Sequence, residues 1–398
     1  MNWKIGLNRG KIRNTQLVKM LNKQAILDAL KQNAPISRAD LAKKTKLSRP
    51  CISSLVDEMI QEDLIHEVGV GDSSGGRKPI LLEYNYLAYA VMGAVFDGTL
   101  LHMALTDLKG DLLSHEQRKL RKPLSGEELI QELKLGYMFL LEKSGFVKEK
   151  ILGIGLGLPG ITKKKDGTIS YSPSTGWMDL PLQKEFEEQL GLPVILDNDV
   201  NMMTLGEYYK GMGIGVSNQI YMYVGTGIGA GIILHDRLYR GSKEAAGEVG
   251  YMMVGPIQTI SRGEFGVFER NYSAPAIYSR AIKDIPNLEK ESSIIKQLND
   301  QIDQDNSTAM TLLEDVYQHW VYGMVNIISL LDPDLLILSG EMANIGERGI
   351  QRIRRFLSEW VPMLPDIQFA TLGEQAGVIG AAFSVLEAFP NLIGKIKS

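Results

Sequence analysis

The sequence predicts a small, basic helical domain followed by a large α/β body. Residues 1–80 hold 14 Lys and Arg against 8 Asp and Glu, a net charge of +6, whereas the whole chain carries −4. From Tyr84 onward, helical apolar spacing gives way to strand-like apolar runs that end in glycine-rich turns. A basic segment on an acidic body is typical of a polyanion-binding module joined to a domain of another function, although a solvated basic face has the same composition.

Three helices are predicted at the start of the chain. Residues 17–32 show the apolar spacing of a first helix. Ser37, with an acidic residue three positions on, predicts the start of a second helix that ends at Lys44. Ser48 predicts the start of a third, with Pro50 in its first turn, where a missing N–H costs little. The inward-facing stripe of the third helix consists of Ile52, Leu55, Val56, Met59 and Ile60.

Two predicted strands, at residues 64–69 and 78–83, follow the helices and flank the tip GDSSGGRK. Three helices and a hairpin in this order predict a winged helix-turn-helix, and therefore DNA binding. A structural three-helix domain with a flexible loop is the alternative. The residues expected to contact phosphates or base edges are Arg38, Arg49, Ser53, Ser54, Arg77 and Lys78.

The body contains apolar runs typical of buried strands, together with a long apolar helix at residues 309–331. The runs lie at residues 90–96, 102–110, 151–160, 193–199, 220–231 and 336–341. The single cysteine, Cys51, excludes an internal disulfide and a thiolate-rich zinc site. Because no long apolar span or signal peptide is evident, we expect a cytoplasmic protein without membrane contact.

Motifs along the body resemble the ROK family, which groups bacterial sugar kinases with sugar-responsive repressors such as those for xylose and N-acetylglucosamine. The motifs are LGLPG (156–160), DNDVN (197–201), GTGIGAG (225–231), LYRG (238–241), AGEVG (246–250), LDPDLLILSGE (331–341) and AGVIGAA (376–382). The resemblance implies two actin-like (ribonuclease H-like) α/β lobes with a cleft between them. The expected domains are 1–82 for the winged helix, 83–200 for the first lobe, completed by 384–398, and 201–383 for the second lobe with ligand and dimerisation elements.

The resemblance also implies a sugar site. Asn198 and Asp199 would touch the sugar, and Asp199 stands where the kinases keep the general base. Glu248 and Glu269 suit vicinal hydroxyls as bidentate acceptors, although carboxylates of this kind also occur in ion pairs. Tyr251 joins the expected ligand residues, as does Ser174, which stands where the family often has Asn and leaves the identity of the sugar open.

Two departures from the family pattern argue against phosphoryl transfer. The kinases' D-x-G-x-T loop reads Val95-Phe96-Asp97-Gly98-Thr99, so an apolar residue replaces the acid and a carboxylate replaces the glycine. A phosphate would meet repulsion there, and ATP is not expected as a cofactor. GTGIGAG is retained, but its glycines can equally serve close packing of a strand and a turn.

The family's zinc loop has also changed. Its one His and three Cys ligands correspond to Tyr251, Ile260, Arg262 and Val267, none of which supplies the donor atom that zinc needs here. No metal is therefore expected, and Ile260, Val267 and Phe268 are the candidates to hold the loop by packing.

These features together predict a transcriptional regulator, a repressor of carbohydrate-utilisation genes, that binds operator DNA and a small neutral sugar or polyol. A homodimer is expected, with a tetramer as the larger alternative, because helix-turn-helix proteins read paired half-sites. The alternative from a different functional class is an active ATP-dependent carbohydrate kinase with an added DNA-binding domain. The third possible function is that of a repressor that needs no ligand and keeps only a vestigial pocket.

Overall fold

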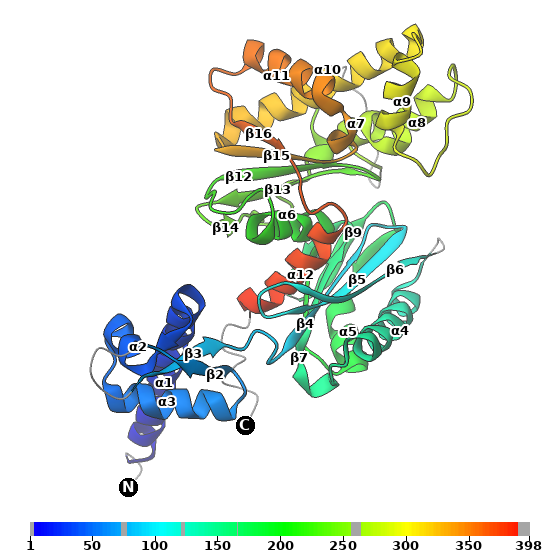
Figure 1. The fold of residues 1–398 in the computed structure, drawn as a ribbon. Helices are drawn as coiled ribbons and strands as arrows, with labels where there is room; N and C mark the ends of the chain where they lie inside the picture. The colour runs from blue at the N-terminus through cyan, green and yellow to red at the C-terminus, as the bar shows by residue number, and fades with distance from the viewer. Residues whose placement is uncertain (1–3, 73–77, 121–123, 165, 256–263, 389–398) are drawn as a thin grey trace. The chain divides into compact units, whose positions relative to one another are not determined.

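The computed structural model describes residues 4–72, 78–120, 124–164, 166–255 and 264–388. The chain divides into two compact units, one of residues up to 90 with 107–109 and the other of residues 91–106 and 110–388 (Figure 1). The finer domain boundaries expected from the sequence stay a prediction.

The first unit is a winged helix-turn-helix. Its elements are α1 Lys4–Asn33, β1 Ile36–Ser37, α2 Arg38–Thr45, α3 Arg49–Gln61, β2 Ile65–Val70 and β3 Ile80–Tyr84. β1 and β2 pair with the two sides of β3 in an antiparallel sheet. The predicted caps are confirmed, because the Ser37 hydroxyl accepts the N–H of Asp40 at 3.2 Å and the Ser48 hydroxyl accepts that of Cys51 at 3.4 Å.

The first helix, α1, begins at Lys4, well before the predicted residue 17. The apolar residues of its C-terminal half, Ile26, Leu27 and Leu30, are buried in the domain core. Leu17 and Leu21, which the same pattern includes, remain 47% and 57% exposed. The apolar spacing therefore identified the helix correctly, but only the part that packs against the other helices contributes to the core.

The second unit begins with a lobe built on a five-stranded sheet, which we call the first lobe. Its elements are β4 Ala90–Phe96, β5 Leu100–Asp107, β6 Leu112–Lys119, α4 Gly126–Ser144, β7 Ile151–Leu158, β8 Ile161–Lys163, β9 Thr168–Ser172, β10 Trp177–Leu180, α5 Leu182–Leu190 and β11 Val194–Asn198. The sheet order is β11-β7-β4-β5-β6, and β8, β9 and β10 form a small separate sheet. β7 and β11 run parallel and end together at the pocket described below.

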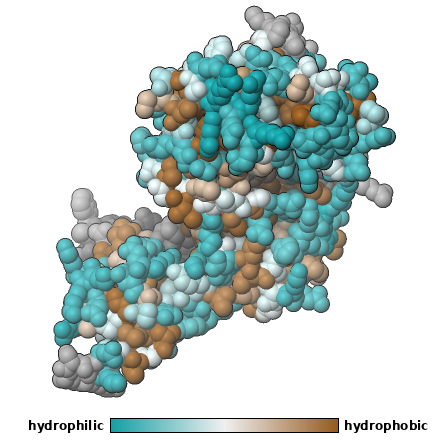
Figure 2. All heavy atoms as spheres, turned by 45° about the horizontal axis from the view of Figure 1, so that its top comes forward, coloured by the Kyte–Doolittle hydropathy of each residue, from teal (hydrophilic) through white to brown (hydrophobic). Residues whose placement is uncertain are grey.

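The second lobe is built on the sheet β14-β13-β12-β15-β16. Its elements are β12 Gln219–Val224, β13 Ile228–Leu234, β14 Arg237–Leu238, α7 Val267–Tyr272, α8 Ala274–Ala281, α9 Ile294–Ile302, α10 Ser307–Leu331, β15 Leu335–Gly340, α11 Gly346–Trp360 and β16 Asp366–Phe369. The run at residues 220–231 begins with the expected buried strand, β12, which ends in a turn at Gly225–Gly227 with a 2.9 Å hydrogen bond from Gly225 N to Gly227 O. After the turn, β13 pairs antiparallel with β12 in a hairpin. Figure 2 shows hydrophilic residues over much of the visible face of this lobe, with hydrophobic residues in smaller groups.

Two helices, α6 Asp199–Lys210 and α12 Gln375–Ala388, cross each other between the two sheets (Figure 1). α12 packs on β7 and β11, while α6 contacts β7 and β13. The helices meet through glycines, since a Cβ at Gly206 would collide with the carbonyl of Ala376, and one at Gly380 with the carbonyl of Met202. α12 begins at Gln375, and residues 389–398 lie outside the described residues.

Candidate functional site

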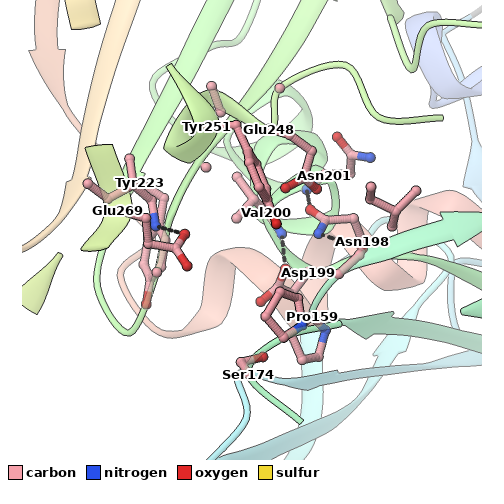
Figure 3. A pocket seen from close by; sticks show the side chains of 18 of the residues that line it. Pro159, Ser174, Asn198, Asp199, Val200, Asn201, Tyr223, Glu248, Tyr251 and Glu269 are labelled. Atoms are coloured by element: carbon pink, nitrogen blue, oxygen red, sulfur yellow. Dashed lines mark hydrogen bonds between the residues drawn. The ribbon is translucent and has the colours of Figure 1, made fainter. Parts of the chain in front are cut away.

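A pocket lies where the strand ends of the first lobe face the glycine hairpin of the second. All of the side chains expected to bind a ligand line it: Ser174, Asn198, Asp199, Glu248, Tyr251 and Glu269 (Figure 3). They come from the β9–β10 turn, from the start of α6, and from the segment around α7. The structure thus brings together residues that are almost a hundred positions apart in the sequence.

The turn from β11 into α6 positions the first two of these side chains. Asn198 caps α6, because its side-chain oxygen accepts the N–H of Asn201 at 3.1 Å. Its amide nitrogen donates to the carbonyl of Gly160 at 3.1 Å, which ties the helix start to the end of β7. Asp199 is the first residue of α6, and one of its oxygens accepts the N–H of Val200 at 2.9 Å.

The preceding carboxylate, Asp197, has a structural role. It accepts a 2.8 Å hydrogen bond from the Asn201 amide and a 2.7 Å charge-assisted bond from Arg240 Nε. Arg240 belongs to the LYRG motif of the second lobe, and Asp197 ends β11 of the first. This partly buried ion pair therefore joins the two lobes.

The pocket is acidic. Asp97, Asp199, Glu244, Glu248 and Glu269 line it, and its described lining includes no Lys, Arg or His. Burial, followed by repulsion from Asp97 and Glu269, raises the pKa of Asp199 to about 7, although the Val200 N–H favours its ionised form. Burial and the neighbouring carboxylates raise the pKa of Glu248 to about 7 as well. Such a site repels anions and favours a neutral ligand that donates hydrogen bonds.

Glu269 lies on α7 against the glycine hairpin. Its Oε2 accepts the N–H of Ile228 at 2.8 Å, and burial raises its pKa. A Cβ at Gly227 or Gly250 would lie 2.9 Å from the same oxygen. These glycines therefore leave room for the carboxylate and give the retained motif a function without nucleotide.

Further glycines of GTGIGAG also serve close packing. A Cβ at Gly231 would collide with the Thr204 hydroxyl of α6, and a Cβ at Gly225 would collide with the Tyr223 hydroxyl. Tyr223 lines the pocket beside the hairpin turn (Figure 3). A tyrosine side chain thus fills the space in front of the first glycine of the loop.

The end of β4 and the β4–β5 turn hold Val95 and Asp97, the two residues that depart from the expected phosphate-loop pattern. Val95 is 2% exposed and packs in an apolar cluster with Met202, Leu205 and Ala381. Asp97 uses Oδ1 to accept the N–H groups of Thr99 and Leu100, each at 2.7 Å. This carboxylate therefore stabilises the turn itself.

The described part of the former zinc loop does not fit a zinc ion. Val267 is 1% exposed, Phe268 is fully buried, and both pack in the core, as predicted. The Tyr251 hydroxyl donates to the carbonyl of Glu264 at 3.4 Å. Ile260 and Arg262 lie outside the described residues, and within the described ranges no three His, Cys, Asp or Glu side chains are grouped to hold a metal.

The predicted DNA-contacting side chains differ in their surroundings. Arg49, Ser53 and Ser54 are exposed on α3, and Lys78 is exposed before β3. Arg38 instead pairs with Asp57 at 2.7 Å and with Glu67 at 3.3 Å, so it connects α2 to α3 and β2. Arg77 lies outside the described residues.

Several residues line the pocket that the sequence did not mark as ligand-binding: Asp97, Tyr171, Asn201 and Tyr223. Asn201 belongs to the DNDVN motif, and Tyr171 lies three residues before Ser174, so both are close to a recognised signal. Nothing in the pattern marked Tyr223, which reads as an ordinary strand residue.

Comparison with known proteins agrees with this architecture. Residues 92–388 match the ROK family. The chain belongs to the ROK family. Residues 21–66 match the winged helix-turn-helix DNA-binding family, an addition that distinguishes this ROK protein from one that consists of the body alone.

Individual ROK proteins resemble the chain along different lengths. The xylose repressor of Caldicellulosiruptor bescii is 30% identical over 94% of this chain and 97% of its own. A ROK family transcriptional regulator, described as a homologue of the E. coli MLC protein, superposes with a TM-score of 0.78 at 22% identity over 95% of this chain and 98% of its own. A ROK glucokinase from Streptomyces griseus, solved with glucose and AMPPNP, superposes with a TM-score of 0.63 at 26% identity over 74% of this chain and 98% of its own.

No helix within the described ranges of this ROK protein is both long and apolar enough to cross a membrane.

Proposed function

We propose that this ROK protein is a cytoplasmic DNA-binding repressor that responds to an unphosphorylated, neutral sugar bound between its two lobes. The observation that carries the proposal is the presence, in one chain, of a winged helix with an exposed Arg49 and a carboxylate-lined pocket without a lining cation in its described part. A relative that extends over nearly the whole chain is a xylose repressor, so D-xylose is the first sugar to test.

DNA binding is tested by substitutions in the winged helix. Arg49→Ala should lower operator affinity by about 1–3 kcal/mol and relax sequence specificity, because Arg49 heads the third helix on its exposed side. Lys78→Ala should weaken all DNA about equally and reduce the salt dependence of binding. Lys184→Ala, on an exposed lysine of the body, is the matched control. Unchanged affinity in both test variants would contradict the assignment.

Sugar binding is tested by calorimetric titration with D-xylose, D-glucose and D-xylose 5-phosphate. The carboxylates should accept hydrogen bonds from sugar hydroxyls and repel the phosphate ester. Measurable binding of a neutral sugar and none of its phosphate is the expected result. Sugar should also change operator affinity, and a coupling of about 1–3 kcal/mol corresponds to about 5- to 150-fold. If operator affinity does not change with any sugar, the alternative of a repressor that needs no ligand would be favoured.

Asp199 and the glycine motif keep a sugar kinase as the alternative function. The buried Val95, the turn-capping Asp97 and the Tyr223 side chain at the hairpin all argue against a bound nucleotide. A coupled assay for sugar-dependent ATP consumption decides between the two, and we expect no turnover.

We further propose a homodimer, because a winged helix that reads two half-sites requires two copies in a fixed arrangement. Light scattering on the purified protein checks this state, and a monomer on operator DNA would contradict it.

A further inference from the structure

A tyrosine that the sequence did not mark lines the same pocket. The Tyr171 hydroxyl is fully buried and makes no hydrogen bond of good geometry within the described part of the chain, although the Tyr251 side chain lies beside it. A buried hydroxyl without a partner costs free energy, so its presence beside a ligand pocket requires an explanation. A ligand group that meets this hydroxyl would supply the missing partner.

The position of Tyr171 in the first lobe is fixed by its backbone. Tyr171 lies on β9, the middle strand of the small sheet, and pairs with Ile161 and Met178. Its carbonyl oxygen packs against Gly160, where φ is +101° and a Cβ would collide with it. Gly160 in turn accepts the Asn198 amide, so Tyr171 and Asn198 are held by the same turn.

A second tyrosine, Tyr251, approaches from the other lobe. Burial, and then the hydrogen-bonding interaction of its hydroxyl with the Tyr171 side chain, raise the pKa of Tyr251. The backbone of Tyr251 is also constrained, because a Cβ at Gly266 would collide with its Cα. Two phenol groups on well-fixed backbones of different lobes therefore meet at the pocket (Figure 3 shows Tyr251).

The chemistry of the lining makes a donor valuable at this place. Ionised carboxylates only accept hydrogen bonds, whereas a sugar also offers acceptor oxygens in its ring and hydroxyl groups. One N–H of each of the Asn198 and Asn201 amides is already used, by Gly160 and Asp197 respectively. A phenol can donate as well as accept, so Tyr171 complements the acidic residues.

We propose that Tyr171 is a positioning residue for the effector, whose hydroxyl hydrogen-bonds to an oxygen of the bound neutral sugar and, together with Tyr251, connects the two lobes around it. This inference rests on the proposed function, because it requires a sugar in the pocket. It adds a specific contact from the first lobe and a reason why the ligand would favour one arrangement of the lobes.

The test uses Tyr171→Phe in the full-length protein, with D-xylose and D-glucose as the probes. The ring is retained and only the hydroxyl is lost, so calorimetry should show sugar affinity reduced by about 5- to 50-fold. The matched control is Tyr137→Phe, which removes another buried hydroxyl without a described partner, on α4 and away from the pocket lining. That control should bind sugar as the wild type does.

Thermal unfolding gives a readout that a merely structural tyrosine would not produce. Without sugar, Tyr171→Phe should unfold at the wild-type temperature or slightly above it, because an unpaired hydroxyl is removed. With sugar, its stabilisation should be smaller than that of the wild type. A lowered unfolding temperature without sugar, together with unchanged sugar affinity, would assign Tyr171 to structure and overturn the inference.

The bridge between the lobes is tested by a double-mutant cycle of Tyr171→Phe and Tyr251→Phe. The two changes should be non-additive in sugar affinity, because both hydroxyls contact one ligand. Strictly additive effects would overturn the bridge. Wild-type protein that binds neither sugar would overturn the proposed function and this inference together, whereas sugar binding that tolerates Tyr171→Phe would overturn the inference alone.

Discussion

The carboxylates that line the interlobe pocket differ in how many backbone N–H groups they accept. At the β4–β5 turn, one oxygen of Asp97 is committed to two backbone N–H groups, and the neighbouring Val95 is sealed in an apolar cluster. At the other end, Asp199 and Glu269 each accept one backbone N–H, and Glu248 accepts none from the described chain. The comparison shows that Asp199, Glu248 and Glu269 keep more of their acceptor capacity for a ligand than Asp97 does.

Val95→Asp should have the largest effect, because it restores the family's acid at a position that is now buried. An unpaired carboxylate among Met202, Leu205 and Ala381 should lower the free energy of unfolding by about 3 kcal/mol or more. Denaturant unfolding measures this change, with Val95→Thr as the smaller, isosteric control. A stable Val95→Asp protein with sugar-dependent ATP turnover would contradict this difference between the Asp97 turn and the carboxylates around Asp199.

Asp199→Asn should weaken sugar binding by about several-fold to a hundredfold, since an acceptor-only group becomes a mixed donor and acceptor. Operator binding without sugar should stay nearly unchanged, because the coupling acts only when the ligand is present. Paired titrations of wild type and variant check this. Equal sugar affinity would place the ligand elsewhere.

Sugar affinity should rise with pH from about 5.5 to about 7 and then level off. Hydroxyl groups that donate to Asp199 and Glu248 favour the ionised carboxylates, whose pKa values in the free protein are about 7. Binding should therefore release protons, which calorimetry in buffers of different ionisation enthalpy detects.

The same groups set the sign of the effect on stability. Folding raises their pKa values from 3.8 and 4.5, so their contribution to stability is full below those values and is lost as pH rises towards about 7. Sugar affinity that falls as pH rises from about 5.5 to about 7, or proton uptake on binding, would contradict the hydrogen-bonding role of the carboxylates.

Asp97→Asn should have the smallest effect, a change in sugar affinity of less than about threefold. The asparagine oxygen can still accept the Thr99 and Leu100 N–H groups, so the turn should persist. Removing this charge should lower the pKa of Asp199, because Asp97 raises it now. A loss as large as that of Asp199→Asn would show that both ends of the pocket bind the sugar.

The features that the sequence predicted correctly depend on residues close together in the chain. Hydroxyl caps at Ser37 and Ser48 fixed the helix starts of the winged domain, because capping depends on residues three positions apart. Motifs at the strand ends predicted the pocket's carboxylates through the family resemblance. Their roles in binding stay predictions.

Other features depend on contacts that no local pattern carries. The apolar run at residues 220–231 predicts a strand that ends in a turn, but the antiparallel return of β13 along β12 depends on pairing between the two strands. Tyr171 and Tyr251 meet only after the two lobes fold together, and Arg38 found acidic partners on α3 and β2 instead of remaining free. Side-chain partners of this kind are set by tertiary packing.

The glycine crossing of α6 and α12 restricts how the lobes can move. Sliding between packed helices normally proceeds through small rotamer changes of the side chains at their interface. At Gly206 and Gly380 the backbones themselves are in contact, so there are no rotamers to absorb a displacement. We therefore expect these two helices to act as a fixed pivot, with hinge rotation concentrated in the residues that connect them to the sheets. Asp199 stands at one such junction, where β11 passes into α6.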